Sequence, residues 1–142
     1  MTDLLDVNVL VGLAWPTHVH HTAASTWFRR RGHRSWATTP FTEAGFVRVS
    51  SNVSAIPEAV TPVEALDLLR RMREVPGHLF IPDDVPLLVG DHLDGARIAT
   101  HRQVTDAHLL ALARRHGGRL VTLDRALAAL SRGEDVVLVP FA

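Results

Sequence analysis

The opening run of the chain, residues 4–14, limits the possible folds more than any other segment, because a carboxylate and an amide interrupt an apolar sequence. Asp6 and Asn8 stand two positions apart within it. We interpret residues 4–6 as the end of a buried strand and residues 9–14 as part of the following helix. Asp6 then lies at the carboxyl end of a strand, where open α/β sheets bind ligands. Capping of the next helix by Asp6 or Asn8 is the simpler alternative.

The remaining sequence repeats this alternation of short apolar runs and helical patterns. Thr-Pro pairs at positions 39–40 and 61–62 are helix start signals, and glycines follow the arginines and histidine at 114–116. The expected strands are residues 35–38, 78–81, 119–123 and 136–139; the expected helices are residues 20–31, 41–50, 61–74, 125–130 and one that begins at Thr105 or Asp106. Core-facing side chains are expected at Phe41, Gly45, Phe46 and Val49 in one helix and at Leu66, Leu69 and Met72 in the next. The pattern predicts an α/β fold with a mainly parallel sheet.

Composition excludes several classes of protein. A length of 142 residues, with 46% hydrophobic and 21% charged residues, is typical of one globular domain. The absence of cysteine excludes disulfides and thiolate metal sites. No apolar run approaches the roughly 18 residues of a membrane span, and the N-terminus lacks the features of a signal peptide. We therefore expect a cytoplasmic protein with no membrane association.

Four acids share one kind of position: Asp6, Glu43, Asp106 and Asp124 each follow a predicted strand or lie in the first turn of a predicted helix. In a parallel sheet these positions meet at one edge. For any one acid alone, helix capping explains the position at least as well. Four carboxylates close together repel one another unless a cation neutralises them. Oxygen ligands without cysteine suit Mg²⁺ or Mn²⁺, so the set predicts a metal site suited to phosphodiester chemistry.

The sequence resembles the PIN-domain ribonucleases, and in particular the VapC-type toxins of bacterial toxin–antitoxin pairs. Four motifs carry the resemblance: Leu-Asp-Val-Asn at 5–8, Thr-Glu at 42–43, the segment 105–113 from Thr-Asp-Ala-His onward, and Thr-Leu-Asp at 122–124. They occur in order and span essentially the whole chain, so the resemblance implies that residues 1–142 form a single PIN domain.

The resemblance also implies a fold, a site and a reaction. The fold is a five-stranded, mainly parallel sheet of order 3-2-1-4-5 flanked by helices. Asp6, Glu43, Asp106 and Asp124 would form the catalytic pocket, with Asp6 and Asp106 as direct Mg²⁺ ligands and Asn8 and Thr122 supporting the carboxylates. The reaction would be metal-dependent hydrolysis of RNA to a 5′-phosphate and a 3′-hydroxyl. Such proteins usually form homodimers and are silenced by a cognate antitoxin.

All fifteen basic side chains are arginine, and seven of them are candidate contacts to RNA phosphates: Arg29, Arg30, Arg31, Arg48, Arg70, Arg71 and Arg102. A codon bias in a GC-rich genome is the favoured explanation for the absence of lysine. For the triplet at 29–31, a solvated helix end is an equal alternative. The formal net charge of zero argues against a broadly basic protein.

Two other functions stay open at this stage. An aspartyl-phosphate phosphatase or receiver domain also places an aspartate at a strand end, but Asp6-Val7-Asn8 lacks the second aspartate of such a phosphatase and the chain has no lysine. The second alternative is a catalytically silent PIN-like module that binds RNA or a partner.

Overall fold

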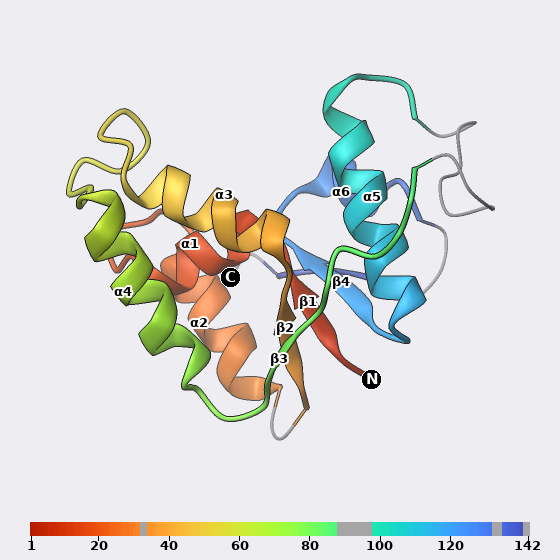
Figure 1. The fold of residues 1–142 in the computed structure, drawn as a ribbon, viewed down its shortest axis with the longest axis horizontal. Helices are drawn as coiled ribbons and strands as arrows, with labels where there is room; N and C mark the ends of the chain where they lie inside the picture. Colours follow the sequence, from red (N-terminus) through yellow and green to blue (C-terminus); the bar gives the residue numbers. More distant parts are fainter. Residues whose placement is uncertain (32–33, 88–97, 132–134, 141–142) are drawn as a thin grey trace.

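The computed structural model describes residues 1–31, 34–87, 98–131 and 135–140, and it contains the expected five-stranded sheet (Figure 1). The strand order is β3-β2-β1-β4-β5, and every neighbouring pair is parallel. The predicted fold class and strand order are therefore confirmed. The strands are β1 (Asp3–Leu5), β2 (Trp36–Thr38), β3 (His78–Phe80), β4 (Arg119–Thr122) and β5 (Val136–Leu138).

Helices cover both faces of the sheet. Figure 1 shows α1 to α4 on one side and α5 and α6 on the other. Their bounds are α1 (Val7–Ala14), α2 (His21–Arg30), α3 (Pro40–Ser50), α4 (Pro62–Arg73), α5 (Arg102–Arg115) and α6 (Arg125–Ala128). Because successive strand residues point to opposite faces, Leu4 packs in the core beneath α5 while Leu5 packs in the core with α1 and α3.

Polar side chains begin several helices where the sequence predicted a start. The Asp6 carboxylate accepts a hydrogen bond from the Val7 N–H (2.8 Å) at the start of α1. At α4, the Thr61 hydroxyl accepts from the Glu64 N–H (3.2 Å) and donates to the Glu64 carboxylate (2.9 Å). These contacts satisfy donors that the first turn of a helix leaves unpaired.

The start of α5 differs from the prediction, because the helix begins at Arg102 rather than at Thr105 or Asp106. The Gln103 side-chain oxygen accepts hydrogen bonds from the N–H groups of Ala99 (2.7 Å) and Thr100 (3.1 Å). These bonds connect the backbone of Ala99 and Thr100 to the first turn of α5. Asp106 consequently lies in the second turn of α5, not in the first.

Two residues expected to face the core are exposed instead. Phe41 keeps 41% of its surface exposed, because it lies in the first turn of α3, and Leu66 keeps 49% because α4 is an outer helix that packs mainly on α3. Gly45, Phe46 and Leu69 are buried as predicted. At Gly45, α3 packs closely on α1, since a Cβ there would lie 2.6 Å from a methyl group of Val7.

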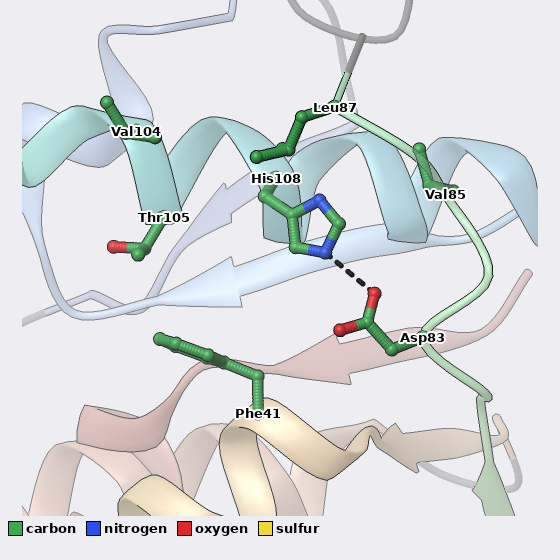
Figure 2. A pocket seen from close by; sticks show the side chains of 7 residues that line it. All are labelled: Phe41, Asp83, Val85, Leu87, Val104, Thr105 and His108. Carbon is green, nitrogen blue, oxygen red and sulfur yellow. Dashed lines mark hydrogen bonds and ion pairs between the residues drawn. The ribbon is translucent and has the colours of Figure 1, made fainter. Parts of the chain in front are cut away.

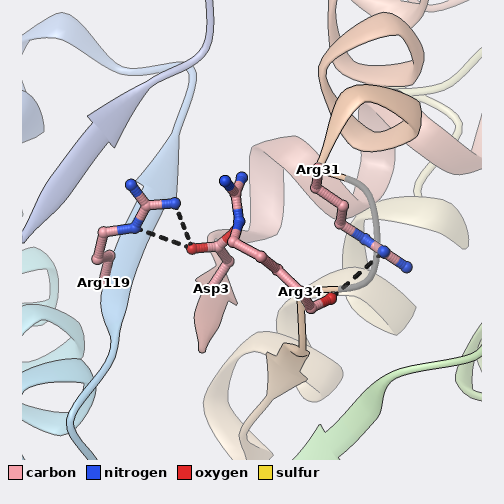
Figure 3. Close-up of polar contacts among 4 residues, drawn as sticks. All are labelled: Asp3, Arg31, Arg34 and Arg119. Carbon is pink, nitrogen blue, oxygen red and sulfur yellow. Dashed lines mark hydrogen bonds and ion pairs between the residues drawn. The ribbon is translucent and has the colours of Figure 1, made fainter. Parts of the chain in front are cut away.

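The amino end of the sheet contains an ion-pair cluster built on one buried carboxylate (Figure 3). The Asp3 side chain is fully buried and accepts hydrogen bonds from Arg119 (2.8 and 3.0 Å) and Arg34 (3.2 Å). Arg31 lies beside this cluster and donates to the carbonyls of Arg34 (3.4 Å) and Pro76 (3.1 Å). The cluster joins the starts of β1 and β4 to the segments that lead into β2 and β3.

Within the described ranges, no helix is both long enough and apolar enough to cross a membrane.

Candidate functional site

Asp6 lies directly after β1, at the carboxyl edge of the sheet, and only 8% of its surface is exposed. One of its carboxylate oxygens accepts from the Val7 N–H, and the other accepts from the Thr122 hydroxyl (2.8 Å) at the end of β4. Burial raises the pKa of Asp6, the two hydrogen bonds oppose that rise, and the negative charge of Asp124 adds to it. Asp6 thus caps α1 and is also a buried acid. Its two hydrogen bonds only partly offset the cost of burying its negative charge.

Asn8 and Thr122 connect the two segments that carry Asp6 and Asp124. The Asn8 amide donates to the Thr122 hydroxyl oxygen (3.4 Å) and accepts from the Leu123 N–H (3.1 Å). The Thr122 oxygen also accepts from the Asp124 N–H (3.0 Å). Asp124 is exposed and caps α6 through the N–H groups of its first turn. These bonds fix the turn after β4 against the start of α1.

Asp106 approaches the same edge from α5 and is half-buried. Burial, followed by the charges of Asp6 and Asp124, raises the pKa of Asp106 to about 6. The structure therefore brings three of the four predicted acids close enough to repel one another. A cation bound among them would remove this repulsion.

Glu43 is placed differently from the three aspartates. Its carboxylate accepts from the Thr38 hydroxyl (2.6 Å) and pairs with Arg73 of α4 (3.4 Å). Thr38 in turn shares a hydrogen bond with His78 of β3 (2.8 Å). Glu43 is not among the charges that raise the pKa of Asp6 or Asp106. Among the residues that the structure describes, no group of three histidine or acidic side chains is arranged to hold a metal ion.

The donor set nevertheless fits a hard divalent cation. Mg²⁺ keeps several waters and usually takes only one or two carboxylates from the protein, so a three-ligand cage is not required. Asp6 and Asp106 supply two carboxylates from different elements, and the raised pKa of Asp106 indicates negative charge without a neutralising partner. The residues present are suited to one hydrated Mg²⁺ or Mn²⁺ ion.

The predicted phosphate contacts fall into two groups. Arg70 lines a groove of about 290 Å³ with Glu43 and Arg73, and Arg48 lines a neighbouring groove that also includes Glu43. Arg71 and Arg102 are exposed. By contrast, the triplet 29–31 ends α2, which leads to the amino end of the sheet, away from the acids.

Arg31 does not fit the predicted role of a phosphate contact. Only 9% of its surface is exposed, its guanidinium bonds backbone carbonyls, and it lies 4.0 Å from the centre of the Phe28 ring. Burial lowers the pKa of Arg31, while the Asp3 charge opposes this shift. These contacts give Arg31 a structural role at the amino end of the sheet.

Two features could not be predicted from the sequence. One is the chain of contacts from His78 through Thr38 to Glu43 and Arg73, which depends on the alignment of β2 with β3 and on the position of α4. The other is a pocket between the first turn of α3 and α5, which includes Phe41 and a hydrogen bond between His108 and Asp83 (Figure 2).

A parallel α/β domain with three aspartates gathered at the carboxyl edge of its central strands defines the general class to which this chain belongs. The family model described as "PIN domain" matches residues 4–133. The chain therefore belongs to the PIN domain family, and the sequence resemblance to that family is confirmed.

Known proteins of this family resemble the chain over almost its full length. The chain is 57% identical over 128 residues to Ribonuclease VapC39 of Mycobacterium tuberculosis. The aligned region covers 90% of this chain and 92% of that protein. Two solved structures share the fold. PAE2754 from Pyrobaculum aerophilum has a TM-score of 0.59 and 24% identity, covering 96% of this chain and 84% of that one. The second is VapBC2 from Rickettsia felis, solved bound to a DNA fragment from the VapBC2 promoter. It has a TM-score of 0.57 and 12% identity, and the match covers 97% of both chains.

Proposed function

We propose that this chain is a metal-dependent endoribonuclease, the toxin of a VapC-type toxin–antitoxin pair, and that residues 1–142 act as a single PIN domain. One observation carries the proposal: Asp6, Asp106 and Asp124 come from three distant segments and converge at one edge of the sheet, where their mutual repulsion contributes to the raised pKa of Asp106. The name of the 57% identical relative, Ribonuclease VapC39, supports RNA as the substrate.

Asp6 and Asp106 would hold a Mg²⁺ ion, for which Mn²⁺ is a chemical substitute. When bound, such an ion lowers the pKa of a coordinated water and stabilises charge on the phosphate oxygens. The acids also weaken the binding of RNA phosphates at the site until a cation neutralises them. Hydrolysis would leave a 5′-phosphate and a 3′-hydroxyl.

The neighbouring side chains would keep the carboxylates ready for the cation. The Thr122 hydroxyl donates to Asp6 and thereby favours its ionised form. Asn8 holds the turn that carries Asp124. Glu43, the fourth acid of the proposed catalytic set, is oriented by Thr38 and Arg73 at the border of the site.

The substrate and partners follow from the surface and from the relatives. Arg48, Arg70, Arg71 and Arg102 are exposed and would contact RNA phosphates, each contact weakening as salt rises. A cognate antitoxin is proposed from the name VapBC2, and a homodimer is proposed from the family resemblance.

A cleavage assay tests the proposal directly. Wild type, Asp6→Asn and Asp106→Asn are incubated with total cellular RNA and either Mg²⁺ or Mn²⁺, with Glu74→Gln as a control at an exposed acid. We expect metal-dependent cuts from wild type and the control, and losses of at least 100-fold from the two site variants. Equal cutting by all four proteins would reject the assignment of the acids.

A catalytically silent module that binds RNA or a partner is the second candidate, favoured by the engagement of Glu43 with Arg73. Titration calorimetry with Mn²⁺ separates the two functions. A module would bind no Mn²⁺ at Asp106 and would cut no RNA, whereas the nuclease loses its Mn²⁺ signal in Asp106→Asn.

A further inference from the structure

We propose that the pocket between α3 and α5 binds one unpaired base of a single-stranded RNA. The pocket has a volume of about 340 Å³, which is at the lower end of the range for small-molecule sites. It is lined by Phe41, Asp83, Val85, Leu87, Val104, Thr105 and His108 (Figure 2). This inference deepens the proposed ribonuclease function and rests on it.

The walls of the pocket are apolar and incompletely covered. Phe41, Leu87 and Val104 keep 41%, 49% and 39% of their surfaces exposed. Single exposed apolar residues are common, but three around one hollow form a surface that a flat apolar ligand would cover. The Phe41 ring is the aromatic group of this set. Aromatic rings of this kind stack with bases in proteins that bind single strands.

A polar pair at one side of the pocket gives it a means to recognise a base edge. A ring nitrogen of His108 lies 2.7 Å from a carboxylate oxygen of Asp83. In Figure 2 the second oxygen of that carboxylate points toward the side of the pocket where Phe41 lies. A carboxylate oxygen accepts hydrogen bonds from the amino groups of bases. The pocket should therefore prefer cytosine, adenine or guanine to uracil, whose edge has carbonyls on both sides of its single N–H.

The other ring nitrogen of His108, Nδ1, is buried and has no hydrogen-bond partner among the described residues. Buried polar atoms are normally paired, and an unpaired one is costly. Because this atom is closed off from solvent, a ligand in the pocket would not reach it without a rotation of the imidazole, so recognition of the base rests on Phe41 and Asp83.

The location connects the pocket to the proposed site of cleavage. Thr105 immediately precedes Asp106 on α5, and Phe41 stands two residues before Glu43 on α3. A base held in this pocket would belong to a nucleotide next to the phosphate at the acids. The pocket would then position the strand and contribute to the choice of the cut site.

Binding measured without a divalent cation separates this inference from catalysis. Fluorescence anisotropy of short single-stranded RNAs is recorded in EDTA, with an abasic nucleotide placed at each position in turn. In wild type, one position should show about a tenfold loss of affinity when its base is removed. In Phe41→Ala, removal of that same base should cost nothing further, whereas Phe41→Tyr should retain the loss. Val53→Ala, in an exposed loop outside the pocket, is the control and should behave as wild type.

A second arm tests the recognition of the base edge. Uracil at the sensitive position should bind about tenfold more weakly than cytosine in wild type, and Asp83→Asn should remove most of this preference, because an amide can also donate. An unchanged preference in Asp83→Asn would overturn the assignment of Asp83.

Failure of the pocket and failure of the nuclease give different results. If wild type cuts RNA but no position is coupled to Phe41, the base pocket is overturned and the nuclease stands. Weakening by Phe41→Ala that is equal for intact and abasic RNA also overturns it. If Phe41→Ala leaves RNA binding unchanged, the base pocket is also overturned. The pocket would then be a site for a side chain of a protein partner. If folded wild type neither binds nor cuts RNA, both proposals fall together.

Discussion

The raised pKa of Asp106 predicts that removing its charge stabilises the metal-free protein. A pKa raised from 3.8 to about 6 corresponds to about 3 kcal/mol at neutral pH. Asp106 is only half-buried, so screening by solvent reduces this to about 1 kcal/mol. Asp106→Asn should therefore unfold about 3–5 °C above wild type at pH 7 in EDTA.

The sign of the pH dependence follows from proton uptake. Between pH 3.8 and about 6, folded Asp106 binds more protons than unfolded Asp106 does, so the stability of the wild type falls as pH rises through this window. Below that window both states are protonated and above it both are ionised. The advantage of Asp106→Asn should consequently be near zero below pH 4, grow up to pH 6 and stay constant above it.

Thermal unfolding followed by circular dichroism, with and without Mn²⁺, measures both effects. Mn²⁺ at 100 times its dissociation constant should stabilise wild type by about 2.7 kcal/mol and should have little effect on Asp106→Asn. Glu74→Gln, at an exposed acid that follows α4, should match wild type in EDTA to within about 0.5 kcal/mol. If Asp106→Asn is no more stable than wild type at pH 7 in EDTA while the control behaves as expected, the repulsion among the acids is not significant and the reasoning is refuted.

Three further changes test the supports of the site and of the sheet. Gly45→Ala should destabilise the protein by about 1–3 kcal/mol in urea unfolding, because the added methyl group would meet Val7 at 2.6 Å; no loss would show that α1 and α3 can separate. Asp3→Asn should cost about 1.5–3 kcal/mol in the same assay, because it removes the buried negative charge that pairs with Arg34 and Arg119; a neutral effect would mean that solvent already screens both arginines. Thr122→Val should weaken Mn²⁺ binding about tenfold and shift its pH profile upward, since it removes a bond that favours ionised Asp6; an unchanged profile, equal to that of Thr122→Ser, would contradict this role.

The fold could be predicted from the sequence because local signals and global topology agree. Thr-Pro pairs begin α3 and α4 at the expected residues, and short apolar runs correspond to the strands. The start of α5 could not be predicted in this way. The Gln103 side chain accepts hydrogen bonds from the backbone of Ala99 and Thr100, and the helix begins at Arg102. Phe41 was misassigned since periodicity alone does not show that the first turn of a helix lies beyond the packed core.

The site was predictable only in part, for a related reason. Positions after strands and at helix starts identified the aspartates that converge, because in a parallel sheet such positions share one edge. The orientation of Glu43 depends instead on Arg73, thirty residues later, and on the alignment of β2 with β3. The partners of Arg31 could not be predicted either, since a cluster of arginines at a helix end has the same sequence whether it is solvated or bonded to the backbone of a neighbouring segment.

The two ends of the sheet differ in how their charges are balanced, and this difference supports the proposed site at the carboxyl end. At the amino end, a fully buried carboxylate, Asp3, is matched by Arg34 and Arg119, so its charge supports the fold. At the carboxyl end, Asp6 and Asp106 have pKa values raised by burial and by neighbouring carboxylates, so their charges oppose the fold. A formal net charge of zero conceals this asymmetry, because it sums charges that the fold separates. Stability alone does not explain why carboxylates at one end of the domain lack cationic partners while the carboxylate at the other end has two. A bound cation would explain this difference.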